Sequence, residues 1–107
     1  MKKILIADDS IVYRHALTSA LSEESGFSVV GTVKNGQEAI EYLSKNPVDL
    51  ITLDIEMPVM DGFQVIEKLA HFPTRPKIIV FTSLDGQGAG NALKALELGA
   101  DDFLTKL

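Results

Sequence analysis

Short apolar runs alternate along this chain with longer segments in which apolar residues recur every three or four positions. The short runs have the length and the aliphatic or aromatic content of buried strands. We expect strands at Lys3–Ala7, Phe27–Val33, Asp49–Leu53, Lys77–Thr82 and Asp102–Thr105. The segments between them predict helices, so strand and helix alternate along the chain. This alternation is typical of an α/β fold, a parallel sheet with helices on its faces.

The predicted helices are preceded by residues that commonly cap helix N-termini. Ser10 and Asn35 precede the first two helices, and Asp61-Gly62 opens the third. Such side chains accept hydrogen bonds from the first N–H groups of a helix. The second helix is expected from about Gly36 to Lys45, and Gly99 ends the fourth. The residues expected to share one face are Tyr13, Ala16, Leu17, Ala20 and Leu21 in the first helix, Ala39, Ile40 and Leu43 in the second, Phe63, Ile66 and Leu69 in the third, and Ala89, Leu93 and Leu96 in the fourth.

Composition narrows the class of protein. The length of 107 residues and the 46% hydrophobic content fit one small domain with a real core. The net charge of −5 argues against a nucleic-acid-binding surface, and the absence of cysteine excludes disulfides and thiolate metal sites. No apolar run approaches the length of a membrane span. We therefore expect a cytoplasmic domain without membrane contact.

Charged residues follow three of the predicted strands. Asp8 and Asp9 end the first apolar run, Asp54 ends the third, and Lys106 follows the last. Open α/β sheets keep their ligand crevice at the carboxyl ends of their strands. Three acids and one base at strand ends therefore predict one shared site.

The residue types indicate which chemistry such a site could carry. A carboxylate is a competent nucleophile once the charge on an incoming phosphoryl group is neutralised, so Asp54 is a candidate acceptor. The adjacent acids Asp8 and Asp9 repel each other, and a divalent cation would relieve that repulsion. Mg²⁺ prefers oxygen ligands and keeps several waters, so a few protein oxygens suffice. The simpler alternatives are a strand-end aspartate at position 54 and a solvated acidic pair that caps the first helix.

Four motifs follow the ends of strands: Asp8-Asp9-Ser10, Leu53-Asp54-Ile55-Glu56-Met57-Pro58-Val59-Met60-Asp61-Gly62, Phe81-Thr82-Ser83 and Thr105-Lys106. Together they resemble the receiver domain of two-component response regulators. The resemblance spans the whole chain in the order and spacing of the family. Within the family, Ser83–Gly88 and Leu96–Phe103 look most like the receiver of the chemotaxis methylesterase.

The resemblance implies a doubly wound, flavodoxin-like sheet of five parallel strands in the order 2-1-3-4-5. The first helix would lie on one face and the next three on the other. It also implies that Asp54 accepts a phosphoryl group from the phosphohistidine of a sensor kinase. The metal, Mg²⁺ or Mn²⁺, would be held by Asp8, Asp9, Asp54 and the backbone carbonyl of Glu56.

Further roles follow from the same resemblance. Lys106 and Thr82 would contact the phosphoryl oxygens, and Thr82 and Phe103 would form a switch that changes an output surface around the fourth helix and fifth strand. The alternative for Phe103 is a permanently buried core residue. Glu56 and Leu84 would tune the lifetime of the phosphoryl group. The loop Gly86–Gly90 is interpreted as a flexible entry to the fourth helix, because its glycine spacing departs from the dinucleotide fingerprint.

One departure from the family concerns the end of the chain. The family continues past the lysine with proline and a fifth helix, whereas here Leu107 follows and the sequence stops. We expect residues 1–107 to be a single receiver domain trimmed from a longer protein. Without the fifth helix, the last three strands would expose apolar side chains on one face, through which a dimer could form.

The implied partners are a sensor histidine kinase and an effector domain or downstream protein. A receiver phosphorylates and dephosphorylates itself but is not an enzyme in the usual sense, while the longer protein would be a methylesterase if the finer resemblance holds. The alternatives are a stand-alone receiver or adaptor that acts by protein binding, and an aspartate-nucleophile phosphohydrolase. The phosphohydrolase class places its nucleophile in an Asp-x-Asp on the first strand, where this chain has adjacent Asp8-Asp9.

Overall fold

The structure, a computed structural model, describes residues 1–83 and 87–106. Strand and helix alternate as predicted, and two strands differ from the prediction by one residue at their ends, since β1 begins at Lys2 and β3 ends at Asp54. The elements are β1 (Lys2–Ala7), α1 (Ile11–Ser22), β2 (Phe27–Val33), α2 (Gly36–Lys45), β3 (Leu50–Asp54), α3 (Gly62–Leu69), β4 (Lys77–Thr82), α4 (Gly88–Leu98) and β5 (Asp102–Thr105).

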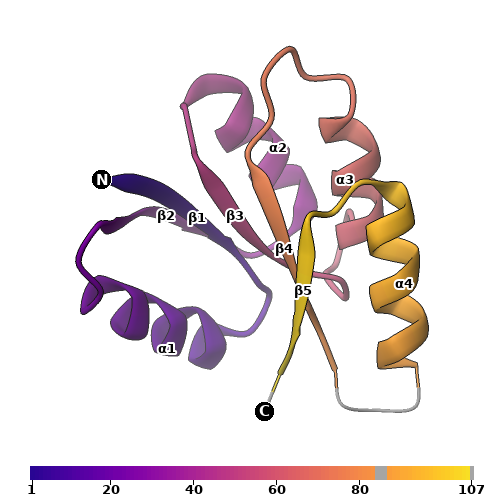
Figure 1. The fold of residues 1–107 in the computed structure, drawn as a ribbon, viewed down its shortest axis with the longest axis horizontal. Coiled ribbons are helices and arrows are strands. Elements are labelled where there is room, and N and C mark those ends of the chain that lie inside the picture. The colour runs from indigo at the N-terminus through magenta and orange to yellow at the C-terminus, as the bar shows by residue number, and fades with distance from the viewer. Residues whose placement is uncertain (84–86, 107) are drawn as a thin grey trace.

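All five strands form one parallel sheet in the order β2-β1-β3-β4-β5, which confirms the predicted fold. Helix α1 lies on one face of the sheet, and α2, α3 and α4 cover the other (Figure 1). Among the described residues no helix follows β5. The order reverses between β1 and β3, which is the point where doubly wound sheets place their ligands.

The predicted helix caps form hydrogen bonds. The side chains of Ser10 and Asn35 each accept a bond from the backbone N–H three residues later. Asp61 accepts a bond from the Gln64 N–H at 2.9 Å, and the Gln64 side chain accepts one from the Asp61 N–H at 3.0 Å. This reciprocal capping box satisfies two N–H groups that the helix itself leaves without partners.

The main core lies between the sheet and the three helices on its second face. Alternate strand side chains point to opposite faces, so each inner strand contributes to this core and to the α1 side. Helix α1 has no buried residue, although it covers the fully buried Ile4 and Ile6 of β1. The largest fully buried side chains in the main core are those of Leu5, Ile51, Leu53, Val65, Ile66, Leu69, Ile78 and Val80.

The apolar residues predicted to share one face of α4 do so, but that face is exposed. Ala89, Leu93 and Leu96 are exposed, Leu93 to 63%. The exposed set and the buried set are offset by one position along the helix, and both have helical spacing. Periodicity alone therefore does not decide which set packs against the sheet. Small side chains let α4 lie close against the sheet. The packing gained by this close approach outweighs the free energy that burying the leucines would provide. The buried stripe is Gly88, Ala92 and Ala95.

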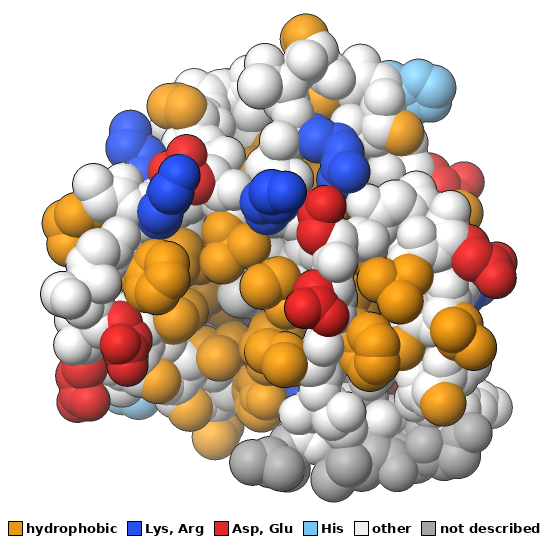
Figure 2. All heavy atoms as spheres, in the orientation of Figure 1, with side chains coloured by type: hydrophobic (Ala, Val, Ile, Leu, Met, Phe, Trp, Pro, Cys, Tyr) orange, Lys and Arg blue, Asp and Glu red, His pale blue; other side chains and the backbone are white. Residues whose placement is uncertain are grey.

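Hydrophobic side chains gather across the middle of the face that Figure 2 shows. On β5, Leu104 is 52% exposed and Phe103 is 39% exposed. Leu104 pairs with Phe81, which contacts α1, so the expected apolar exposure on the α1 face is present at Leu104, whereas Thr52 of β3 and Phe81 of β4 remain buried. Phe103 points to the opposite face, beside α4. Phe103 is not a permanently buried core residue in this structure.

The sequence predicts no membrane-spanning segment, because no apolar run is long enough. Within residues 1–83 and 87–106, no helix combines the length and apolar character that crossing a bilayer requires.

Gly36 offers a test of how α2 is placed. A Cβ atom at this position would lie 2.3 Å from the Met60 carbonyl oxygen and 2.7 Å from Cγ2 of Val65. The Gly36 N–H also donates to that carbonyl at 2.9 Å. We expect Gly36→Ala to lower the free energy of unfolding by about 1–3 kcal/mol, because backbone must move to relieve the overlap. Urea denaturation followed by circular dichroism measures the change.

The matched control is Gly90→Ala in α4, where an added Cβ meets nothing within 4 Å. Alanine is the better helix former, so this variant should be neutral or more stable by up to about 1 kcal/mol. Equal losses in the two variants would contradict the packing described here.

Candidate acidic site at the carboxyl edge of the sheet

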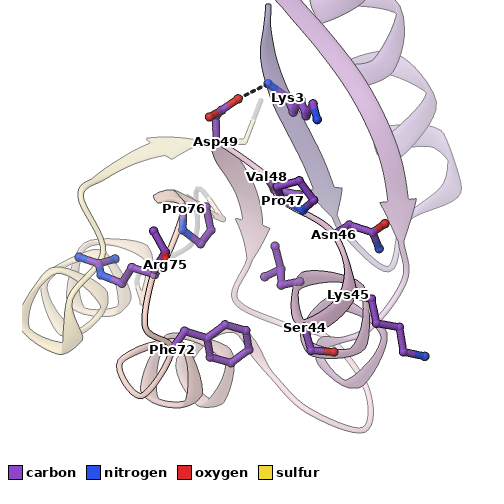
Figure 3. A pocket seen from close by; sticks show the side chains of 12 residues that line it. Lys3, Ser44, Lys45, Asn46, Pro47, Val48, Asp49, Phe72, Arg75 and Pro76 are labelled. Carbon is purple, nitrogen blue, oxygen red and sulfur yellow. Dashed lines mark hydrogen bonds between the residues drawn. The ribbon is translucent and has the colours of Figure 1, made fainter.

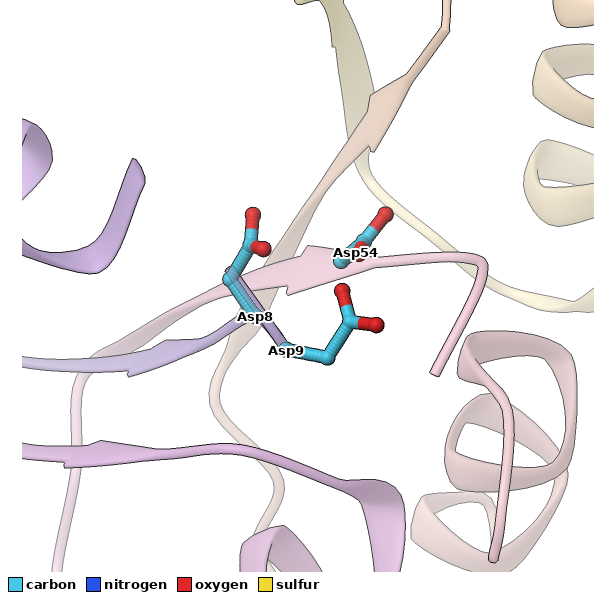
Figure 4. Close-up of side chains that lie close together, drawn as sticks. All are labelled: Asp8, Asp9 and Asp54. Carbon is cyan, nitrogen blue, oxygen red and sulfur yellow. The ribbon is translucent and has the colours of Figure 1, made fainter. Parts of the chain in front are cut away.

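The sheet order brings the ends of β1 and β3 side by side. Ala7 pairs with Leu53 across the two parallel strands, so the residues that follow reach the same edge. Figure 4 shows Asp8, Asp9 and Asp54 close together there. One carboxylate oxygen from each residue lies within 4.8 Å of the others. The structure therefore brings the three predicted acids together in a geometry that could hold a metal ion.

The three acids differ in burial and in hydrogen bonding. Asp8 is 2% exposed and Asp54 is 7% exposed, whereas Asp9 is exposed. Oδ1 of Asp8 accepts a bond from the Ser10 N–H at 2.9 Å, and Oδ1 of Asp54 accepts one from the Glu56 N–H at 3.3 Å. One oxygen of each buried carboxylate thus accepts a hydrogen bond from backbone, and the other lies near the ammonium of Lys106.

Lys106 supplies a positive charge to this cluster. Its Nζ lies 2.8 Å from Oδ2 of Asp8 and 3.4 Å from Oδ2 of Asp54. The Lys106 N–H donates to the Thr82 carbonyl at 2.8 Å, which extends the pairing of β4 and β5 and directs the side chain to the site. The acids and the lysine that follow the strands therefore lie together, as predicted.

One ammonium does not balance the buried negative charge. Burial, and then the charge of Asp8, raise the pKa of Asp54 from 3.8 to about 7, although Lys106 and the Glu56 N–H act to lower it. Burial acts to lower the pKa of Lys106, but its hydrogen bond to Asp8 and the two carboxylate charges prevail and raise it. The site thus holds a firmly charged lysine beside a carboxylate that is poorly compensated. Such a donor set suits a divalent cation.

Thr82 and Glu56 line the same hollow as Asp9, Asp54 and Lys106, with a volume of about 200 Å³. Thr82 is buried at the end of β4. Phe103 does not line this hollow but a separate one of about 510 Å³ beside α4, which it shares with Thr82. Thr82 therefore lines both hollows. Leu84 and Leu107 lie outside the described residues, as does the start of the Gly86–Gly90 loop.

A second hollow lies at the opposite edge of the sheet, with a volume of about 570 Å³ (Figure 3). Lys3, Phe72 and Arg75 are among its lining residues, and its one acid, Asp49, accepts a hydrogen bond from the Lys3 N–H at 2.7 Å. Its acid already accepts a hydrogen bond from backbone, and no second carboxylate lines this hollow among the described residues. The smaller hollow at the carboxyl edge is therefore the better candidate site.

Sequence reasoning missed three residues around the site. Asn91 of α4 lines the 200 Å³ hollow, Arg14 donates from Nη1 to the Asp8 carbonyl at 2.7 Å, and the Tyr13 ring lies 4.5 Å from Nζ of Lys106. Asn91 is in none of the motifs, so no pattern indicated it. Tyr13 follows the Asp8-Asp9-Ser10 motif closely, but its contact with the far end of the chain depends on the fold.

Comparison with known proteins identifies the family. The model of the response regulator receiver domain matches residues 4–107. The protein-glutamate methylesterase/protein-glutamine glutaminase 1 of Oleidesulfovibrio alaskensis is 45% identical over 106 residues, which are 99% of this chain and 28% of that protein. The corresponding protein of Desulfotalea psychrophila is 41% identical over 104 residues, 97% of this chain and 29% of that protein. The chain thus spans less than a third of the length of these relatives.

Solved structures agree in fold. The response regulator domain of Thermotoga maritima CheB superposes with a TM-score of 0.90 at 34% identity, covering 99% of this chain and 78% of that chain. A chain of the CheX-CheY-BeF3-Mg²⁺ complex of Borrelia burgdorferi superposes with a TM-score of 0.86 at 32% identity, with 99% and 78% covered.

The raised pKa of Asp54 predicts how stability depends on pH without divalent cations. Between pH 4 and pH 7 the folded state keeps a proton that the unfolded state has lost, so the free energy of unfolding falls as the pH rises through this window. Asp54→Asn removes the buried charge. We expect this variant to be more stable than the native chain by about 2 kcal/mol at pH 8, and the difference to shrink towards pH 4.

Urea denaturation in the presence of a chelator at both pH values measures this difference. Asp102→Asn is the matched control, because Asp102 is an exposed aspartate of β5. The control should show no comparable pH dependence. An Asp54→Asn variant that is no more stable than the native chain at pH 8 would show that the burial of this charge is not destabilising.

Proposed function

The chain belongs to the response regulator receiver family, and we propose that it is a phosphoacceptor domain in which Asp54 receives a phosphoryl group from the phosphohistidine of a sensor kinase. The observation that supports this most is the convergence of three carboxylates, two of them buried, and one ammonium at a single edge of the sheet. A hollow of about 200 Å³ is smaller than the ~300–1,000 Å³ of typical small-molecule sites. It suits a phosphoryl group presented by another protein better than a whole small substrate, which favours a receiver over a phosphohydrolase.

The donor set fits Mg²⁺ or Mn²⁺. Asp8, Asp9 and Asp54 would hold the ion together with the backbone carbonyl of Glu56, and waters would fill the remaining positions. The poorly compensated charge around Asp54 is the feature of this chain that favours such an ion. When bound, the ion neutralises charge on the carboxylates and on the phosphoryl oxygens.

In the transfer step an oxygen of the Asp54 carboxylate attacks phosphorus. A phosphorus–oxygen bond forms as the phosphorus–nitrogen bond of the donor breaks, and the imidazole leaves with the electron pair of that bond. Lys106 would stabilise the negative charge on the phosphoryl oxygens as a point charge, and the Thr82 hydroxyl would donate to one of them. The Glu56 N–H, already bonded to Asp54, orients the nucleophile. The side chain of Glu56 would influence how fast water removes the phosphoryl group, and we propose the same of Leu84.

The proposed output surface is formed by α4 and β5. Thr82, Ser83, Leu93 and Phe103 line a hollow of about 510 Å³ between these elements. Phe103 is 39% exposed at the side of this hollow, so it has space to move inward. A bond between Thr82 and a phosphoryl oxygen would draw Thr82 toward the acidic site and favour that movement. The exposed surface would thus report on the state of Asp54.

The curated relatives suggest where this domain operates. Their names describe protein-glutamate methylesterases, and this chain matches under a third of each. We propose that residues 1–107 form the single regulatory receiver domain of such a chemotaxis protein, with a kinase and an effector domain as cytoplasmic partners. A stand-alone receiver that acts by protein binding is the alternative. The net charge of −5 makes nucleic acid an unsuitable direct partner.

Phosphorylation by a small donor tests the proposal without a kinase. Incubation with acetyl phosphate and Mg²⁺ should add one phosphoryl group, because the proposed acceptor lies beside the ammonium of Lys106 and two further carboxylates. Intact-mass spectrometry measures the gain. We expect none with Asp54→Asn and none when the metal is removed, since the acceptor or the charge neutralisation is then lost.

The control is again Asp102→Asn, which keeps every residue of the acidic site and should be phosphorylated like the native chain. If the folded native chain gains no phosphoryl group, or if Asp54→Asn gains one equally, Asp54 is not the acceptor.

A further inference from the structure

The ammonium of Lys106 is enclosed on three sides. Two of them are carboxylates, Asp8 at 2.8 Å and Asp54 at 3.4 Å. The third is the ring of Tyr13, with Nζ 4.5 Å from the ring centroid. That distance is well inside the range of about 6 Å in which an aromatic face attracts a cation. Lys106 therefore has one uncharged partner in addition to its two acids.

The Tyr13 ring is itself held in place. Tyr13 lies in the first turn of α1, where its N–H donates to the Ser10 hydroxyl at 3.2 Å. Its ring meets Phe81 of β4 edge-on, with centroids 5.9 Å apart and an interplanar angle of 73°. The next residue, Arg14, anchors the same turn by donating to the Asp8 carbonyl. The ring is thus packed against β4, and its turn of α1 is anchored to the end of β1.

We propose that Tyr13 is a positioning residue that holds the Lys106 ammonium beside Asp54 when a divalent cation occupies the carboxylates. The inference rests on the proposed function. A cation on Asp8 and Asp54 competes with Lys106 for the same oxygens, and like charges repel. The attraction of the aromatic face uses no ligand oxygen, so metal binding leaves it intact. The ring thereby keeps Lys106 where the incoming phosphoryl group arrives.

A double-mutant cycle tests this role. Tyr13→Leu keeps an apolar side chain but removes the ring face, and Lys106→Met keeps the stem but removes the ammonium. We expect Tyr13→Leu to slow phosphorylation by acetyl phosphate and Mg²⁺ about fivefold when Lys106 is present, and to have no further effect in the Lys106→Met background. Urea midpoints of the same four proteins without metal should likewise be non-additive. Additive effects in both measurements would overturn the proposal.

A second series separates electrostatics from packing. Tyr13→Phe keeps the ring face and should restore the native rate, whereas pentafluorophenylalanine in place of Tyr13 keeps the shape but reverses the polarity of the face. That replacement should slow phosphorylation about as much as Tyr13→Leu. Equal rates for the two ring variants would assign Tyr13 a packing role only. This series remains informative if Tyr13→Leu does not fold.

Two controls complete the design. Tyr42→Leu alters the other tyrosine of the chain, which lies on α2 and donates its hydroxyl to the Val30 carbonyl, and should leave the rate unchanged. The Mg²⁺ dissociation constant of Tyr13→Leu, measured by calorimetry, should stay within about twofold of the native value, because the ring supplies no ligand. A native chain that is not phosphorylated would refute the proposed function. A phosphorylated native chain with an equally fast Tyr13→Leu variant would refute only the role of Tyr13.

Discussion

The ion pair between Lys106 and the two buried carboxylates is the interaction on which the rest of the site depends. Asp8 and Asp54 are removed from water at a distance where their charges repel, and a single ammonium at 2.8 Å and 3.4 Å offsets part of that cost. The part of this cost that Lys106 does not offset raises the pKa of Asp54. A site with this imbalance favours additional positive charge, which a divalent cation would supply.

The fold provides this arrangement through strand order and close packing. Placing β1 between β2 and β3 brings Asp8 and Asp54 to one edge, and β5 returns Lys106 to the same edge by pairing with β4. Close contacts hold the neighbouring segments, because a Cβ at Gly62 would lie 2.5 Å from the Asp54 carbonyl oxygen. The backbone around Asp54 is therefore closely packed, while the surface formed by α4 and β5 keeps exposed apolar side chains. A rigid site beside an exposed surface fits a domain that reports a chemical change to a partner.

Much of this could be predicted from the sequence, because strand ends in a parallel sheet share an edge whatever the details of packing. Asp8, Asp54 and Lys106 were predicted to meet for that reason, and Ser10 and Asn35 were predicted as caps because capping is local. The face of α4 could not be predicted, since the choice between leucines and small residues depends on how near the helix lies to the sheet. The contact of Tyr13 with Lys106 joins the first helix to the last strand, so only the folded chain shows it.

The effect of Mg²⁺ on stability at two pH values tests the charge imbalance most directly. The free energy of unfolding of the native chain would be measured by urea denaturation, with and without saturating Mg²⁺, at pH 5 and pH 8. Because a ligand that binds only the folded state stabilises it and carboxylates must be deprotonated to bind metal, the gain should be larger at pH 8. A gain that is absent at both pH values, or that does not grow with pH, would contradict the view that buried, poorly compensated carboxylates define this site.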